Sequence, residues 1–568
     1  MLETKVHRRR IRVIIGTVVL IGALSIGRLF FLQIIHGKAY AEHAEHQYVS
    51  VTDTFDRGNI YLKDKNDELI AAATIESGFR LAIVPGRLKG DEATYEAIAN
   101  IIPLNKEAFL TAAEKKNDPY EEVAERVTPE QADAINKLKL PGVTLYADKW
   151  RFYPGGTLAS KAIGFVSYKD NTLTGNYGLE NYYNDVLSRS SEDLSVNFFA
   201  ELFANVQSTL FKNTGASGDI VTSIEPNVQT ELERSVAAVK EQWSSDAVGG
   251  VVMDPYTGEI IAMAQVPTFD PNSYSNVDDI SVYTNPFAQN VYEMGSIIKP
   301  LIMSSAIDAG KVTPQTTYFD KGSVTVGNKT IYNFDKKGRG TATMQDVLNQ
   351  SLNTGMVFVE GQMGKDVFRD YVFNHFKLGE KTGIDLPGEV NGLVGTLKGN
   401  NDVNFATAAF GQGIAITPLN IIRGYAALAN GGYLVTPHLA TAILKKNGDE
   451  KTLDWPKSGA ILKPETVSTI TTMMIHVVDD GYHRGLAHYT VAAKTGTAQI
   501  ARPDGTGYYD DRNLHSLVGF FPATNPRFVV YFFNYYPKKV NYAVQTLADP
   551  FFNMVQFLAN YYDITPDR

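Results

Sequence analysis

The sequence predicts an α+β domain in its C-terminal part, preceded by a mixed region and by one apolar helix near the N-terminus. Three observations support this prediction. β-like runs flank a helical stretch after residue 218, short strands and helices are mixed between residues 40 and 217, and an apolar run covers residues 13–35. Strands at both ends of a segment, with helices between them, favour one antiparallel sheet with a helical layer packed on it.

The composition limits the possible functions. Of the 568 residues, 44% are hydrophobic and 20% are charged, which is typical of a globular protein with two or three cores. There is no cysteine, so disulfides and cysteine-ligated metals are excluded. The net charge of −9 argues against a nucleic-acid-binding surface.

The N-terminal run predicts a transmembrane anchor. Basic residues precede it, namely Lys5, Arg8, Arg9, Arg10 and Arg12. At about 1.5 Å per residue, a helix over residues 13–35 crosses a bilayer, and the basic residues favour a cytoplasmic N-terminus. Arg28, the one charge in the run, would snorkel or face a second membrane protein. The alternative is a cleaved signal peptide, because Ala39-Tyr40-Ala41 resembles a cleavage site.

The region before residue 217 alternates short strands with helices. LAIVPG (81–86) and GVTLYA (142–147) are typical of strands, and TPEQADAINKLK (128–139) of a helix. No residue of this region stands out as a nucleophile. His43 and His46 are spaced so that they could share a metal, but a solvated helix face is the better interpretation because no third ligand lies nearby.

The C-terminal part carries the elements of the predicted sheet. GDIVTSI (218–224) leads into an amphipathic helix over residues 225–243, and residues 247–266 predict two strands joined by a Tyr-Thr-Gly turn. Three further strands are expected within residues 489–501, 515–523 and 526–536. The last of these is rich in aromatic residues and is expected to lie in the sheet core.

Ser296 and Lys299 lie three positions apart in YEMGSIIKPL (292–301). If a helix starts here, the Ser296 hydroxyl lies within reach of the Lys299 amine, and Ile297 and Ile298 turn toward the core. A neutral lysine can take the serine proton, and desolvation or a neighbouring cation makes a lysine neutral near pH 7. This hypothesis of a nucleophile and its base therefore predicts a second cation. The structural alternative for Ser296 is a helix N-cap.

Two Lys-Thr-Gly stretches follow. Lys381-Thr382-Gly383 lies among glycines, acids and a proline, and is expected to be a structural loop. Lys494-Thr495-Gly496 lies in a β-like run that is expected in the central sheet. There, Gly496 would let a substrate backbone approach closely.

The second stretch offers groups that suit an acyl-transfer site. Lys494, together with the hydroxyls of Thr495 and Thr497, can bind a carboxylate. The backbone N–H groups of Ser296 and Thr497 are candidates for an oxyanion hole.

Ser351-Leu352-Asn353 lies between these motifs in a predicted helical stretch. The Ser351 hydroxyl can relay a proton to a leaving amine, and the Asn353 amide can hold a substrate carbonyl. Taken alone the pattern is weak evidence, because Ser195-Val196-Asn197 matches it too.

The order Ser-x-x-Lys, Ser-x-Asn, Lys-Thr-Gly-Thr is the signature of penicillin-binding proteins and related lactamases. With it, the chain resembles a class B penicillin-binding protein, a monofunctional peptidoglycan D,D-transpeptidase. Other stretches similar to this family are RGNIYLKDKNDELIA (57–71), RFYPGG (151–156), GFVS (164–167), GNYGLE (175–180), MDPYTGEIIAMAQVPTFDPN (253–272), FGQGIAITPLNIIRGYAALANGG (410–432) and KTGTAQ (494–499).

Three positions depart from the family pattern. Met294 stands where proline is usual, Ile297 where a small residue is usual, and Lys65-Asn66-Asp67 where Arg-Asn-Gly is usual. We expect the first two to keep the helix and its apolar packing, and Asp67 to be tolerated in an outer turn.

The resemblance implies a fold and a topology. A transpeptidase domain of the penicillin-binding and serine β-lactamase-like type, an antiparallel sheet with helical layers, is expected at 218–568 on an elongated mixed pedestal domain at 36–217. A single transmembrane anchor at 13–35 would leave a basic tail, 1–12, in the cytoplasm. The protein would then be a single-pass protein of the bacterial plasma membrane, with its catalytic domain outside the cytoplasm.

The resemblance also implies a reaction. Ser296, deprotonated by Lys299, would attack the D-Ala-D-Ala carbonyl of a peptidoglycan stem peptide, expel D-alanine and form an acyl-enzyme. The amine of a neighbouring stem peptide would then form the crosslink. β-Lactams would acylate the same serine, and neither a cofactor nor a metal is implied.

Partners and alternatives follow from the same resemblance. The motifs are more similar to division-type than to elongation-type proteins, so the expected partners are a membrane glycan polymerase and other wall-synthesis proteins. A catalytically silent scaffold or β-lactam sensor is one alternative. A D,D-carboxypeptidase or β-lactamase is another, although the sequence reveals no base that would position a hydrolytic water.

Overall fold

The structure, a computed structural model, describes residues 56–169, 172–188, 217–445, 447–482, 485–502, 504–505 and 507–568. They belong to two compact units: the first contains Asp56 and residues 76–150, and the second contains residues 57–75 and the described residues between 151 and 568. The predicted anchor and tail lie outside the described residues, none of whose helices has the length and apolarity to cross a membrane. The predicted domain boundary at residue 217 stays a prediction.

The first unit packs three helices on strands. In it, the end of β2 (Leu69–Ile83) pairs antiparallel with β3 (Glu121–Val127), and β4 (Val143–Phe152) also pairs with β2. The helices are α3 (Asp91–Ala99), α4 (Lys106–Glu114) and α5 (Pro129–Lys137), with a short 3₁₀ turn, η2, at Pro85–Arg87. A capping box between Thr128 and Gln131 starts α5, which confirms the helix predicted there. Leu81, Ile98 and Phe109 lie in the hydrophobic core of this first unit.

A sheet in the second unit has the strand order β15-β14-β7-β1-β2. Its strands are β1 (Ile60–Lys63), β7 (Gly218–Thr222), β14 (Ala440–Lys445) and β15 (Glu450–Thr452), with the start of β2. β1 and β7 are parallel, and the other pairs are antiparallel. The stretch GDIVTSI, which precedes the predicted helix, contains β7 and belongs to this sheet. A hairpin of β5 (Val166–Lys169) and β6 (Thr172–Gly175) and the short helices α6 (Ser160–Ile163), α7 (Gly178–Tyr182) and α8 (Asn184–Leu187) belong to the same unit.

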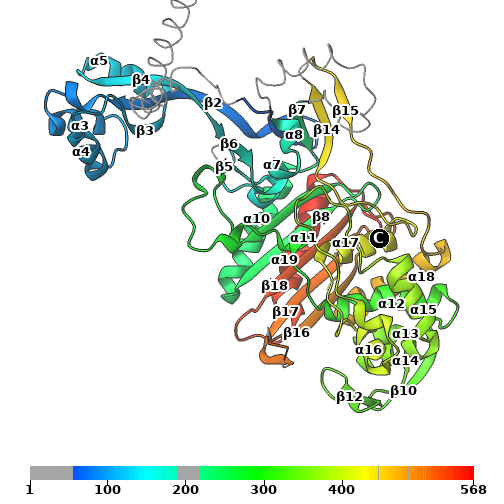
Figure 1. Ribbon diagram of the computed structural model, residues 1–568. Coiled ribbons are helices and arrows are strands. Elements are labelled where there is room, and N and C mark those ends of the chain that lie inside the picture. The colour runs from blue at the N-terminus through cyan, green and yellow to red at the C-terminus, as the bar shows by residue number, and fades with distance from the viewer. Residues whose placement is uncertain are drawn as a thin grey trace, which may run out of the picture. The chain divides into compact units, whose positions relative to one another are not determined.

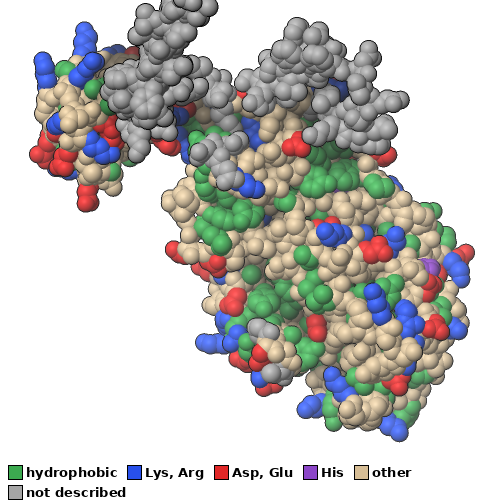
Figure 2. Space-filling view, in the orientation of Figure 1, with side chains coloured by type: hydrophobic (Ala, Val, Ile, Leu, Met, Phe, Trp, Pro, Cys, Tyr) green, Lys and Arg blue, Asp and Glu red, His purple; other side chains and the backbone are tan. Residues whose placement is uncertain are grey.

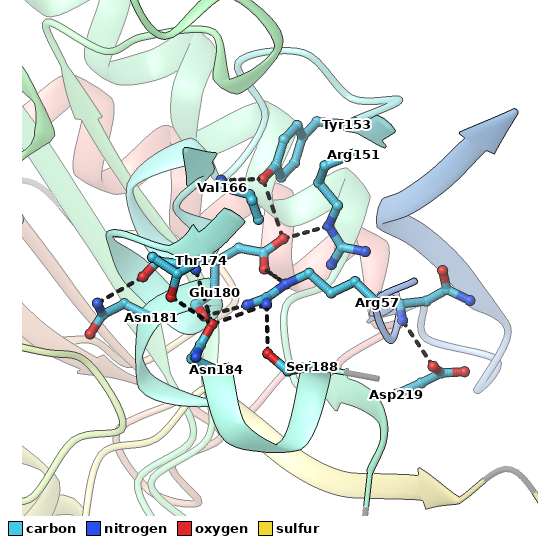
Figure 3. A network of polar contacts seen from close by, with 12 residues as sticks. Arg57, Arg151, Tyr153, Val166, Thr174, Glu180, Asn181, Asn184, Ser188 and Asp219 are labelled. Atoms are coloured by element: carbon cyan, nitrogen blue, oxygen red, sulfur yellow. Dashed lines mark hydrogen bonds and ion pairs between the residues drawn. The ribbon is translucent and has the colours of Figure 1, made fainter. Parts of the chain in front are cut away.

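A buried ion-pair network joins three of the sequence stretches singled out above (Figure 3). The Glu180 carboxylate, which is fully buried, accepts hydrogen bonds from Arg57 Nε and Arg151 Nε, both at 2.6 Å. The Tyr153 hydroxyl donates to it at 3.3 Å. Burial alone would raise the pKa of Glu180, but the charges of Arg151 and Arg57 outweigh burial and lower it.

The predicted antiparallel sheet is confirmed. Its order is β16-β17-β18-β8-β9, and every neighbouring pair is antiparallel (Figure 1, where β16 to β18 and β8 are drawn in orange, red and green). The strands are β8 (Ala247–Met253), β9 (Ile260–Val266), β16 (Ala492–Ala501), β17 (Tyr508–Phe521) and β18 (Phe528–Tyr535). β18 is buried along nearly its whole length, as its aromatic sequence predicts.

Two layers of helices enclose this sheet. On one face α10 (Pro226–Trp243) and α19 (Ala543–Tyr561) share a core with residues such as Val252 and Phe532. On the other face the buried helix α17 (Pro418–Ala429) packs against β17 and β18. The predicted helix at 225–243 is thus confirmed, whereas the sequence interpretation assigned no element to α19.

The remaining helices and short strands form a lobe beside the sheet. Its helices are α11 (Pro286–Gln289), α12 (Lys299–Asp308), α13 (Met344–Asn349), α14 (Asn353–Met363), α15 (Lys365–Asp370), α16 (Asp402–Ala408) and α18 (Pro464–His476). Shorter helical turns are η3 (Pro271–Ser273), η4 (Ile280–Tyr283), η5 (Gly295–Ile298), η6 (Tyr371–His375), η7 (Gly395–Lys398) and η8 (Val477–Tyr482). Two hairpins pair β10 (Thr317–Asp320) with β13 (Gly340–Thr343), and β11 (Ser323–Val326) with β12 (Lys329–Tyr332). On the face shown in Figure 2, basic and acidic side chains are interspersed over the second unit.

The first Lys-Thr-Gly stretch is a structural loop, as predicted. The Glu389 carboxylate accepts hydrogen bonds from Thr382 N at 2.6 Å, from the Thr382 hydroxyl and from Gly383 N. This internal cap uses the Thr382 hydroxyl and the N–H groups of Thr382 and Gly383, so the loop does not offer these groups to a ligand.

Replacing Glu180 by glutamine should strongly destabilise the second unit. Two arginines would be left with uncompensated buried charge, which costs about 3–5 kcal/mol of unfolding free energy. Urea denaturation followed by tryptophan fluorescence measures the loss. The control is Glu231→Gln, since Glu231 pairs with the exposed Arg234 and should change the unfolding midpoint little. Equal stability of both variants would show that the network contributes no more than a surface ion pair.

Candidate active site

Ser296 lies on the wall of a cavity of about 940 Å³. Ser296 lies in a single 3₁₀ turn, η5, and α12 begins directly after this turn, at Lys299. Ile297 and Ile298 are fully buried, which confirms their predicted orientation toward the core. Ser296 itself is half-buried, so its hydroxyl is held on a rigid turn at the cavity wall.

Ser351 occupies a break between two helices. α13 ends at Asn349 and α14 begins at Asn353, and Ser351 between them has a left-handed backbone with φ of 55°. The prediction of one helical stretch through this motif is therefore wrong at these residues. The fully buried Leu352 fixes the break, which leaves the Ser351 side chain in the cavity wall.

Lys299 is fully buried, and its Nζ lies within hydrogen-bond distance of three oxygens. They are Ser351 O at 2.6 Å, Ser351 Oγ at 3.2 Å and Asn353 Oδ1 at 2.9 Å. We expected the amine to be within reach of Ser296, whereas its hydrogen bonds go to the Ser351–Asn353 segment. The physical reason is that a desolvated amine needs strong acceptors, and a carbonyl and an amide oxygen supply them.

The Asn353 amide is held at both ends. Its oxygen accepts from Lys299, and its Nδ2 donates to Tyr332 O at 3.0 Å. Its main contact is thus with the buried amine rather than with a ligand. Nδ2 retains a second proton, and Asn353 also lines the cavity, so the expected contact with a substrate carbonyl stays a prediction.

Lys494 reaches the same hydroxyl from the sheet. It lies in β16 opposite Val518 of β17 and is almost fully buried. Its Nζ lies 3.1 Å from Ser351 Oγ and 3.1 Å from Thr495 O. Two amines from distant parts of the chain thus flank one serine oxygen.

The two lysines have no acidic partner among the residues that the structure describes. Burial lowers the pKa of Lys494 to about 7. Burial also lowers the pKa of Lys299 well below its ordinary value, and the positive charge of Lys494 lowers it further. The second cation that the nucleophile-and-base hypothesis requires is therefore present in the structure, beside Lys299.

Gly496 is closely surrounded by other parts of the protein on the side where a Cβ would point. A Cβ at this position would lie 2.5 Å from Ser516 Oγ, 2.8 Å from Met294 O and 3.1 Å from Ile297 Cγ2. On the side where a Cβ would point, Gly496 thus lies against Ser516 of β17 and against the residues at η5, and the expected approach of a substrate backbone stays a prediction. The glycine lets the turn that carries Ser296 pack directly on β16.

Thr495 and Thr497 both line the cavity. Thr497 Oγ1 accepts the Ala543 N–H at the start of α19, at 3.1 Å, so this hydroxyl is engaged by the protein. The ideal Cβ of Gly295 lies 3.2 Å from Thr497 O, which shows how closely the two proposed oxyanion-hole segments approach.

Several cavity residues had no signal as chemistry-bearing residues in the sequence. They are Phe334, Arg339, Phe410, Gln412, Tyr482, Asn541 and Tyr542. Phe410 and Gln412 belong to the FGQG stretch, which could have indicated them. Tyr482 lies in no motif, and only the fold brings it to β16.

Glu293 helps to hold the turn that carries Ser296. Its carboxylate accepts the Gly413 N–H at 3.1 Å and the Tyr508 hydroxyl at 2.9 Å. Burial raises the pKa of Glu293. Gly295 N also donates to Gly411 O at 3.1 Å, so the residues before Ser296 are tied to the 411–413 loop.

Comparison with known proteins identifies the family. The model of the penicillin binding protein transpeptidase domain matches residues 248–555, and that of the penicillin-binding protein dimerisation domain matches residues 53–221. The chain is 30% identical over 523 residues to stage V sporulation protein D of Bacillus subtilis, covering 89% of this chain and 78% of that protein. It is 27% identical over 538 residues to peptidoglycan D,D-transpeptidase FtsI of Escherichia coli K12, covering 92% and 86%.

Solved structures agree on the fold. Penicillin binding protein 3 of Mycobacterium tuberculosis, complexed with aztreonam, superposes with a TM-score of 0.68 at 23% identity and covers 91% of this chain and 98% of its own. Penicillin binding protein 2X of Streptococcus thermophilus gives a TM-score of 0.71 at 23% identity, with coverages of 90% and 80%. The chain therefore belongs to the penicillin-binding proteins that carry a transpeptidase domain.

Proposed function

We propose that the chain is a peptidoglycan D,D-transpeptidase in which Ser296 is the nucleophile and Lys299 its general base. The observation that supports this most strongly is the pair of buried lysines around the Ser351 hydroxyl, beside the cavity that Ser296 lines. A buried amine crowded by a second one is a base at neutral pH rather than a solvated charge.

Acylation follows from these positions. Neutral Lys299 takes the Ser296 proton as the serine oxygen attacks the carbonyl between the two D-alanines of the donor stem peptide. The N–H groups of Ser296 and Thr497 stabilise the oxyanion. When the C–N bond breaks, the leaving amine of D-alanine takes up a proton, and an acyl-enzyme remains on Ser296.

Ser351 suits the role of proton relay. Its oxygen accepts from Lys299 and from Lys494, which uses both of its acceptor positions. The hydroxyl proton of Ser351 is then free for the leaving amine, and Lys299 can restore it. The amine of the acceptor stem peptide deacylates the enzyme by the reverse sequence.

Lys494 and Thr495 are placed to bind the terminal carboxylate of the donor peptide. Both line the cavity on β16, on the strand that packs against the nucleophile turn. A β-lactam presents a carboxylate and a strained amide in the same relation, and acylates the same serine. The chemistry requires no metal or cofactor from this residue set.

Substitution of Ser296 by alanine should abolish covalent labelling by a fluorescent penicillin. The purified protein is incubated with the probe and resolved on a denaturing gel, and labelling should fall at least a hundredfold because the proposed acyl-enzyme forms on the Ser296 oxygen. Ser304→Ala is the matched control, since Ser304 is buried in α12 and donates to Leu301 O. Undiminished labelling of Ser296→Ala would show that another residue is acylated.

We further propose a division role at the plasma membrane. The anchor at 13–35 would hold the protein with a cytoplasmic N-terminus and an extracytoplasmic catalytic domain, next to a membrane glycan polymerase. The resemblance of the motifs to division-type proteins and the name FtsI among the relatives support this role. Depletion of the protein should then produce filamentous cells, and rounded cells would instead assign it to elongation.

A further inference from the structure

Tyr482 holds the threonine of the carboxylate-binding strand. Its hydroxyl oxygen lies 2.7 Å from Thr495 N and 3.0 Å from Thr495 Oγ1. Tyr482 and Thr495 both line the cavity that contains Ser296. The tyrosine closes η8, the π-helical continuation of α18, which brings it to β16 although no motif connects the two.

Either hydroxyl of the Tyr482–Thr495 pair can be the donor, and the backbone contact of Tyr482 favours the phenol in that role. Thr495 N–H donates to the Tyr482 oxygen, so that oxygen already serves as an acceptor. Burial raises the pKa of Tyr482 to about 12, so the phenol keeps its proton at neutral pH. The partner at hand for that proton is Thr495 Oγ1. If Thr495 Oγ1 accepts a hydrogen bond from the phenol, the proton of the Thr495 hydroxyl cannot point toward Tyr482. It then points into the cavity.

The backbone of Thr495 is occupied as well. β16 is an edge strand of its sheet, and Thr495 turns its N–H and C=O to the open edge, where Tyr482 and Lys494 Nζ bind them. Because strand residues alternate, Thr497 is the next residue that faces this edge. Tyr482 thus holds β16 at Thr495, two residues before Thr497, the proposed oxyanion-hole residue.

The Thr495 hydroxyl is important for carboxylate binding because Lys494 does not carry a full positive charge. With a pKa of about 7, Lys494 is only partly protonated at neutral pH. A bound carboxylate favours protonated Lys494, and a second donor that does not titrate strengthens the contact without requiring that proton uptake. A neutral hydroxyl that is already oriented supplies that donor without an ordering cost at binding.

We infer that Tyr482 is a positioning residue for substrate selection: by donating to Thr495 Oγ1, it aims the Thr495 hydroxyl at the carboxylate of the donor peptide or of a β-lactam. The inference rests on the proposed function and adds to it the residue that sets the carboxylate requirement. A merely structural tyrosine would hold β16 in place for every ligand alike. A positioning tyrosine acts only on ligands that carry a free carboxylate.

The test is Tyr482→Phe in the purified protein, with two probes that differ in the carboxylate alone. Benzylpenicillin carries it, and benzylpenicillin methyl ester does not. We expect the second-order acylation constant for the acid to fall about fivefold to tenfold, mainly through weaker binding before acylation. For the methyl ester we expect a change of less than twofold. The ratio between the two probes removes general effects on folding or on Ser296.

A matched control and a coupling test complete the design. Tyr489→Phe removes a phenol hydroxyl that donates to Ile564 O, outside the cavity lining, and should leave both constants unchanged. In a Thr495→Val background, Tyr482→Phe still removes the acceptor of the residue 495 N–H, but it should change the ratio between the acid and the methyl ester less than twofold, because the hydroxyl that it orients is gone.

Three outcomes would overturn the inference. They are an equal loss for both probes, no loss for the acid, and the same change in the ratio between the two probes with valine at position 495 as with threonine. Failure of the proposed function is distinguishable from these, because the unmodified protein would then not be acylated at Ser296 by either probe.

Discussion

The site depends on one unfavourable arrangement, two lysine amines buried beside the same serine oxygen. Lys299 and Lys494 both contact Ser351 Oγ, and no acidic side chain of the described residues pairs with either. Two like charges at this separation in a poorly solvated interior repel strongly. The arrangement is favourable only if at least one amine is neutral, and a neutral lysine is the base that an unactivated serine hydroxyl requires.

The fold keeps this arrangement from relaxing. Lys299 opens α12, a helix whose residues are almost all buried, while Lys494 lies on β16, which pairs with β17. The break at Ser351 is fixed by Leu352 in the core. Because these elements belong to different parts of the chain, moving the lysines apart would require unpacking a helix or a strand, and the surrounding core opposes that.

Most of the fold could be predicted, because each strand of the main sheet has its own apolar run and each motif is contiguous in the sequence. The contacts between one motif and another could not be predicted from the sequence. The contact of Lys299 with Ser351 rather than Ser296, the packing of the η5 turn against Gly496 and the hydroxyl of Tyr482 on Thr495 all arise from tertiary packing. α19 was overlooked because its aromatic residues follow a strand of similar composition.

The most direct test is the protonation state of Lys299, measured by NMR titration of the protein labelled with carbon-13 at lysine Cε. Since its pKa is lowered, Lys299 should lose its proton well below the ordinary titration range of lysine. In Lys494→Met one cause of that lowering is gone, so the titration should move to higher pH. A Lys299 signal that titrates near pH 10 in the unmodified protein would contradict the account.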